Sequence, residues 1–222
     1  MNPLMINVIA LFMGLMTFSV LLGPALHLSP LWPTGVIVVS LSLVTLDTAR
    51  WNAQGTTLLL DWWAQRWPQH RQRVLHHEAG HFLVAYLLDI PITGYALSAW
   101  ETWRQGLPGQ GGVWLDEPAA IASLSPSQVE HYCTVWMAGQ VAEALVYGTA
   151  EGGKDDQAQA WALLTQRGVD PQSQVQQATR RARELLRSHW SAYQALIAAM
   201  GERASVSDCQ TCIQHAILSD NS

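Results

Sequence analysis

The sequence predicts a mainly helical protein that begins with a pair of transmembrane helices. Three observations support this fold class. Two long apolar runs occupy the first fifty residues, and no charged residue precedes Asp47. After Pro68, apolar residues recur at spacings near 3.6, the period of an α-helix. Further segments then begin with helix-capping residues and end at glycine, as helices commonly do.

The two apolar runs predict a transmembrane helical hairpin over residues 1–49. Residues 4–22 form a run of 19 uncharged, mostly apolar residues, long enough to span about 30 Å of hydrocarbon. A slightly shorter run, residues 31–46, follows a loop rich in Pro and Gly. A cleaved signal peptide is the alternative, but no basic residue precedes the first run and a second run follows at once.

The basic residues predict the orientation of the chain in the membrane. All of them follow the second run, beginning with Arg50 and continuing with Arg66, Arg71 and Arg73. The positive-inside rule therefore places the rest of the chain on the cytoplasmic side, or its stromal or matrix equivalent. Residues 50–70 are predicted to be a juxtamembrane linker rich in Trp and Arg. Its tryptophans suit either lipid headgroups or a protein core, and the sequence leaves both open.

The composition excludes some classes of function. The chain has 222 residues, of which 49% are hydrophobic and 13% charged, so it is apolar for a soluble protein. Its net charge is −5 and its single lysine is Lys154, so no basic patch for nucleic acid is present. Cys133, Cys209 and Cys212 cannot all pair in disulfides. The Cys209–Cys212 pair lacks the further ligands of a zinc site and is interpreted as structural or incidental.

The motif HEAGH at residues 77–81 predicts a metal site on a helix. His77 and His81 are four residues apart, so both imidazoles project from one helix face and can bind one Zn²⁺ at about 2.0–2.1 Å. Glu78 is placed to take a proton from a water molecule and pass it to a leaving amine. Three polar side chains on an apolar helix are costly unless they have a use. Chance occurrence of this short pattern is the alternative.

A catalytic zinc needs a third protein ligand, and the start of a later helix offers carboxylates. Ser125, Pro126 and Gln128 begin a helix that Gly148 ends. Another helix is expected to begin at Asp155 or Asp156, after two glycines. A carboxylate at a helix start is a rigid mount for a metal, but N-capping is the usual role of aspartate there.

Three blocks in order resemble the peptidase domain of FtsH-type zinc metalloproteases. They are HEAGH at 77–81, MAGQVAEALVYG at 137–148 and EGGKDDQAQA at 151–160. The second is similar to the family pattern L-A-G-R-x-A-E-E-x-x-F-G, and the third to T-G-A-S-N-D-L-x-x-A. The resemblance implies that residues 71–222 form a helical, zincin-like zinc peptidase domain.

The resemblance also implies roles for single residues. His77, His81 and Asp156 correspond to zinc ligands and Glu78 to the catalytic base. Glu143 is either a rival third ligand or a group that orients a histidine. The family has an extended strand after HEAGH, so residues 93–100 and 111–118 are expected to form a β-hairpin with a glycine-rich tip. A substrate peptide would pair along its edge.

The chain departs from the family in one large feature. No G-x-x-x-x-G-K-[ST] motif occurs, and too few residues lie between the apolar runs and HEAGH for an ATPase domain. The sequence therefore predicts a membrane-anchored zinc endopeptidase for flexible or unfolded protein substrates, without its own motor. The alternative is a non-proteolytic adaptor of a full-length FtsH-type ATPase–protease. Because FtsH-like peptidase domains tend to form rings, the resemblance also implies a homo-oligomer. An intramembrane protease is disfavoured because charged residues directly precede the motif.

Overall fold

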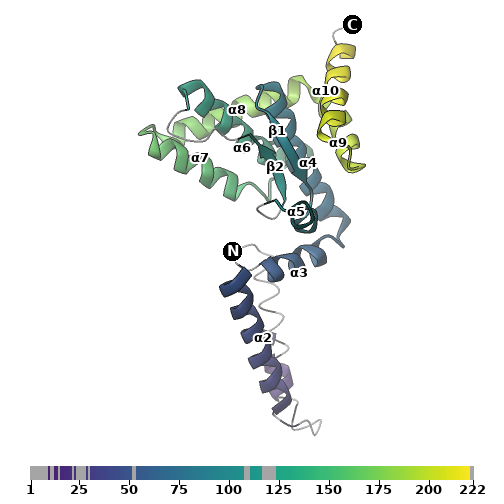
Figure 1. Ribbon diagram of the computed structural model, residues 1–222. Coiled ribbons are helices and arrows are strands. Elements are labelled where there is room, and N and C mark those ends of the chain that lie inside the picture. Colours follow the sequence, from purple (N-terminus) through teal and green to yellow (C-terminus); the bar gives the residue numbers. More distant parts are fainter. Residues whose placement is uncertain are drawn as a thin grey trace. The chain divides into compact units, whose positions relative to one another are not determined.

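The computed structural model describes residues 10, 13–14, 16–21, 23, 29, 31–51, 54–107, 111–116 and 124–220. These residues are mainly helical, which confirms the predicted helical class (Figure 1). The chain divides into two compact units, Met1–Leu59 and Leu60–Ser222, which are called unit 1 and unit 2 below. Much of the first apolar run, residues 4–22, lies outside the described residues.

Unit 1 contains α2 (Leu31–Trp51) and the start of α3 (Gln54–Ala64). Asp47 Oδ1 accepts a hydrogen bond of 2.9 Å from the backbone N–H of Gly55, so the end of α2 is tied to the start of α3. Several apolar side chains of α2 are exposed, among them Leu31, Trp32 and Leu43. No helix within the described residues has both the length and the apolarity to cross a membrane. The predicted transmembrane hairpin is therefore not supported.

Unit 2 is a packed set of helices with one apolar core. The helices are α4 (Pro68–Leu87), α6 (Pro126–Tyr147), α7 (Lys154–Gln166), α8 (Pro171–Ser188), α9 (Trp190–Gly201) and α10 (Val206–Asp220). α6 packs between α4 and α8, α7 lies against α6 and α8, and α9 contacts both α4 and α10. All six helices contribute buried apolar residues to the core, and Phe82, Met137 and Tyr193 are among the largest fully buried side chains.

Small residues allow α4 and α6 to approach closely. A Cβ on Gly80 would lie 2.7 Å from the Ala138 carbonyl oxygen and 2.7 Å from the Ala142 Cβ. Side chains larger than hydrogen do not fit at such distances, so glycine is required at this crossing. The crossing brings the middle of α4, which carries the HEAGH motif, against the middle of α6.

A two-stranded antiparallel sheet lies between α4 and α6 in the sequence. β1 (Ile92–Ala96) pairs with β2 (Gly112–Leu115), with a register shift between Ile92 and Gly94. The predicted first strand, residues 93–100, is wrong at its end, because β1 stops at Ala96 and α5 (Ala99–Gln105) lies between the strands. Ser98 caps α5 by accepting a hydrogen bond from the Glu101 N–H, and Gly106 ends it in the left-handed conformation.

Local capping fixes the helix starts that flank the site. Ser125 and Gln128 form the predicted reciprocal capping box at the start of α6. α7 begins at Lys154, before the predicted start at Asp155 or Asp156, because Gly153 at its N-cap takes the left-handed conformation with φ of 88°. Both aspartates therefore lie inside the first turn of α7, and neither is the N-cap.

Candidate metal centre

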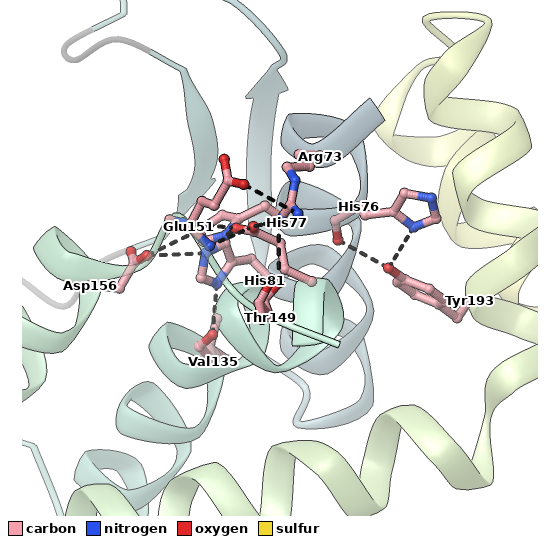
Figure 2. Close-up of polar contacts among 11 residues, drawn as sticks. Arg73, His76, His77, His81, Val135, Thr149, Glu151, Asp156 and Tyr193 are labelled. Atoms are coloured by element: carbon pink, nitrogen blue, oxygen red, sulfur yellow. Dashed lines mark hydrogen bonds and ion pairs between the residues drawn. The ribbon is translucent and has the colours of Figure 1, made fainter. Parts of the chain in front are cut away.

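The HEAGH segment lies in the buried part of α4, where this helix packs on α6. His77 and His81 are one helical turn apart, and the centroids of their rings are 4.7 Å apart. His81 is buried, and only 12% of the His77 side chain is exposed. The structure thus places the two imidazoles next to each other, as their spacing in the sequence predicts (Figure 2).

Asp156, in the first turn of α7, completes a group of three potential ligands. Its Oδ2 lies 3.2 Å from His77 Nε2 and 3.5 Å from His81 Nε2. Figure 2 shows its side chain directed toward the two rings. One ligand atom from each of the three residues lies within 4.8 Å of the others, and no second group of this kind is found in the described part of the chain. Asp155, the other candidate, is exposed.

Gly139 of α6 lies directly against the two imidazoles. A Cβ on Gly139 of α6 would lie 2.4 Å from His81 Nε2 and 2.5 Å from His77 Nε2. Any side chain at this position would clash with both rings, so glycine is required for the two imidazoles to adopt these positions. Two histidines and one carboxylate are a common ligand set of catalytic zinc, and other divalent transition metals also accept it. The residues therefore fit a metal.

Both histidines are held through their other ring nitrogen. His77 Nδ1 lies 2.8 Å from Glu143 Oε1, and His81 Nδ1 lies 2.7 Å from the carbonyl oxygen of Val135. Metal-binding histidines commonly donate their second N–H in this way, which fixes the ring and leaves Nε2 for the metal. Glu143 therefore contacts the nitrogen of His77 that Asp156 does not contact. This geometry suits Glu143 to orienting the ring and Asp156 to binding the ion.

Glu78 is a buried carboxylate with an unpaired oxygen. The residue is 9% exposed, and its Oε2 has no hydrogen-bond partner among the described residues. Burial raises the pKa of Glu78, and the nearby imidazoles of His77 and His81 partly oppose this rise. An unpaired buried carboxylate oxygen destabilises the fold. Such groups gather at functional sites, where a reacting molecule becomes their partner.

The charges in this group depend strongly on one another. Burial alone lowers the pKa of His77, but hydrogen bonds to Asp156 and Glu143 outweigh burial and raise it well above its usual value. Burial also raises the pKa of the two carboxyls, yet their contacts with His77 lower the pKa of Asp156 and bring that of Glu143 to about 2. A metal ligand must be deprotonated. An ion that binds here therefore replaces a proton on His77.

Two residues of the site have no role in the sequence-based prediction. Gly139 is part of the second sequence block, but its use becomes visible only when α6 is placed against the histidines. In the sequence, Arg73 is only one of several basic residues that follow the apolar runs. The structure places its Nη1 3.2 Å from Glu143 Oε2. Its position one helical turn before His77 is the signal in the sequence that points to the site.

None of the cysteines belongs to this group. Cys133 is buried in α6, and Cys209 and Cys212 lie on α10, with all three thiols free.

No protein-family model matches the sequence, and no curated protein matches it. The metal-site assignment therefore depends on the geometry of the described residues and on the three short sequence blocks.

Proposed function

We propose that this chain is a zinc-dependent endopeptidase of the kind that the FtsH-type blocks suggest. One observation carries the proposal. One ligand atom from each of His77, His81 and Asp156 lies within 4.8 Å of the others. The buried carboxylate of Glu78 lies on the same helix as the two histidines. This combination suits hydrolysis better than a purely structural zinc, which takes four protein ligands.

Each residue has a defined part in the proposed reaction. His77, His81 and Asp156 would hold the zinc ion, whose chemistry is Lewis-acid polarisation of the scissile carbonyl group. Glu78 takes a proton from the attacking water molecule and then donates it to the leaving amine. The raised pKa of Glu78 suits both transfers, because a base that is too acidic holds the proton poorly. Glu143 and the Val135 carbonyl keep the imidazoles in place.

Extended segments of flexible or unfolded proteins are the proposed substrates. The β1–β2 pair has only two strands among the described residues, and both strands pack against α4. A strand in a two-stranded sheet has an edge at which an extended peptide can form backbone hydrogen bonds. The sequence contains no P-loop motif, so the proposed activity needs substrates that are already unfolded.

The proposed place of action is a membrane surface, on the cytoplasmic side or its stromal or matrix equivalent. The uncharged residues 4–22 and 31–46 support this location. Trp62 and Trp67 also support it, because they are 58% and 59% exposed and so are not part of the core. The guanidinium carbon of Arg66 lies 4.0 Å from the centroid of the Trp62 ring. Exposed Trp and Arg side chains together suit the lipid headgroup region.

Metal content and proteolysis of the purified full chain test the proposal. The wild type should bind zinc in a one-to-one ratio and cleave an unstructured protein such as casein. Cleavage should stop on chelation and return with zinc. Glu78→Gln should keep the zinc and lose cleavage, whereas His77→Ala and Asp156→Ala should lose or weaken zinc binding. Asp155→Ala is the matched control, because this neighbouring carboxylate is exposed and should affect neither property.

Three results would contradict the proposal in different ways. Cleavage by Glu78→Gln would exclude Glu78 as the base. A wild type without metal, purified under conditions that retain zinc, would remove the metallopeptidase assignment. A protein that binds zinc, cleaves nothing alone and co-purifies with an ATP-dependent protease would instead favour the adaptor function.

A further inference from the structure

We propose that Arg73 is a positioning residue that holds the loop before α7 so that Asp156 meets the two histidines. This inference rests on the proposed function. It assigns a role to a side chain that touches neither the metal position nor the reacting groups. Its basis is a continuous set of contacts from Arg73 through Glu143 to the segment that carries Asp156.

Arg73 joins α4 to the end of α6 and to the loop that follows it. Its Nη1 donates to Glu143 Oε2 and to the Thr149 carbonyl oxygen, each at 3.2 Å. Its Nη2 lies 3.2 Å from Glu151 Oε1. The guanidinium carbon also lies 4.5 Å from the centroid of the Tyr147 ring. One side chain thus contacts four residues between positions 143 and 151.

Glu143 connects these contacts to the metal position. Its Oε1 lies 2.8 Å from His77 Nδ1 and accepts the Gly152 N–H at 3.2 Å. Its Oε2 accepts the Glu151 N–H at 3.0 Å and the Arg73 Nη1 at 3.2 Å. One carboxylate therefore orients a ligand histidine and also fixes the backbone just before α7.

The fixed backbone leads directly to Asp156. A Cβ on Gly152 would lie 2.7 Å from Glu143 Oε1 and 3.1 Å from His77 Nδ1, so the loop passes directly beside the histidine. Gly153 then turns the chain in the left-handed conformation, and Asp156 follows in the first turn of α7. Few residues separate the anchored backbone from the ligand. A shift of this loop would therefore displace Asp156 relative to His77 and His81.

Burial explains why the Arg73–Glu143 contact matters more than the others. The Glu143 side chain is 3% exposed and that of Arg73 is 21% exposed, whereas that of Glu151 is 71% exposed. Exposed ion pairs contribute little, but a buried carboxylate that loses a cationic partner keeps a charge that its remaining contacts compensate less well. A planar guanidinium can bind two acceptors and stack on Tyr147 at once, which the point charge of a lysine cannot do.

Zinc affinity and the visible spectrum of the Co²⁺-loaded full chain test this role. Arg73→Ala should weaken zinc binding by about 10- to 100-fold, as loss of an outer contact of a metal site commonly does. Its Co²⁺ absorption bands should also change, because these bands report ligand geometry. Arg73→Lys should recover part of both properties. Arg71→Ala, which removes an exposed arginine of the same helix, should stay within about twofold of the wild type.

The melting temperature of each metal-free variant separates positioning from general stability. A merely structural role would lower the melting temperature and leave the Co²⁺ spectrum of the folded protein unchanged, which would overturn the proposal. Wild-type zinc affinity in Arg73→Ala would overturn it as well. If Arg73→Ala does not fold, a folded Arg73→Lys with wild-type affinity and spectrum overturns it.

The same measurements distinguish this inference from the proposed function. A wild type that binds no metal removes the proposed function itself. A wild type that binds zinc and cleaves protein, beside an Arg73→Ala that binds zinc equally well, removes only the role of Arg73.

Discussion

Gly139 is the residue where the smallest chemical change has the largest expected effect. Even a Cβ there would lie 2.4 and 2.5 Å from the two Nε2 atoms, so a methyl group would displace the imidazoles. Gly139→Ala should therefore weaken zinc binding by about 100-fold or more, because metal–ligand distances must hold within about 0.2 Å. Competition with a chromophoric chelator measures the affinity.

Gly201→Ala is the control for this substitution. Gly201 is also a helical glycine, but its Cβ would meet only Leu75 Cδ2 at an ordinary distance of 3.8 Å. This variant should bind zinc like the wild type, and both variants should keep the helical circular dichroism of the metal-free protein. Zinc affinity at the wild-type level in Gly139→Ala would mean that these imidazoles, as placed here, do not hold the ion.

Protonation of His77 makes the effect of zinc depend on pH. Burial opposes the charge, but hydrogen bonds to Asp156 and Glu143 raise the pKa of His77 from 6.5 to about 10 in the metal-free protein. The stability that this shift contributes is complete below pH 6.5 and is lost as the pH rises through about 10. Zinc replaces the proton, so the rise in melting temperature that zinc causes should grow between pH 6.5 and about 8.5.

Thermal unfolding with zinc and with chelator, at several pH values, measures the rise in melting temperature that zinc causes. The metal-free protein by itself should lose stability over the same interval, because the folded state binds a proton that the unfolded chain has released. If zinc raises the melting temperature by the same amount at all pH values, His77 is already neutral in the metal-free protein.

Among the elements, α6 depends on its N-terminal cap. The Gln128 N–H donates to Ser125 Oγ at 3.2 Å, and Gln128 Oε1 accepts the Ser125 N–H at 2.8 Å. Ser125→Ala should lower the free energy of unfolding by about 1 kcal/mol. Ser127→Ala is the control, because this exposed hydroxyl makes only one long contact, of 3.5 Å, to His131 Nε2. Urea denaturation of the metal-free protein measures both, and equal stabilities would exclude a contribution from the cap.

The same cap illustrates which elements could be predicted from the sequence. α6 and α8 begin at Ser125 and Asp170 because their start signals act within three residues, and local patterns contain that information. α5 also has local signals, Ser98 followed by Glu101 and then Gly106, but it has only seven residues, and such signals alone do not secure so short a helix. Its first turn is held by the Ala99 N–H donating to Asp61 Oδ2 at 2.9 Å, a contact across 38 residues. Helices this short depend on such tertiary contacts more than on propensity.

At the scale of the whole molecule, some residues of the site could likewise be predicted from local sequence patterns, and others could not. His77 and His81 follow from their spacing on one helix, so the motif alone predicts that they lie together. The contacts of His77 with Asp156 and of Arg73 with Glu143 span 79 and 70 residues. No local period relates such positions. Asp156 could be proposed only through the resemblance of its block, and Arg73 required the packed arrangement of α4, α6 and the loop before α7.

Unit 2 has one core, and its cysteines can report whether this core opens as a whole. Cys133 in α6 and Cys209 in α10 are 1% and 0% exposed and belong to the same buried cluster. Burial raises the pKa of Cys133 to about 11 and also raises that of Cys209. Both thiols should therefore react with iodoacetamide only when unit 2 opens. The partly exposed Cys212 should react in the folded protein.

A zinc ion bound at α4 and α7 should slow the labelling of Cys133 and Cys209 by the same factor. Binding to the folded state alone lowers the open population, by about 100-fold at a free zinc concentration 100 times the Kd. Mass spectrometry after timed labelling gives the rate for each thiol, and Cys212 is the internal control that zinc should not affect. Slower labelling of Cys133 alone would show that α9 and α10 open independently of the metal-binding helices. Equal slowing would show that the metal centre and the distant end of unit 2 belong to one cooperative structure.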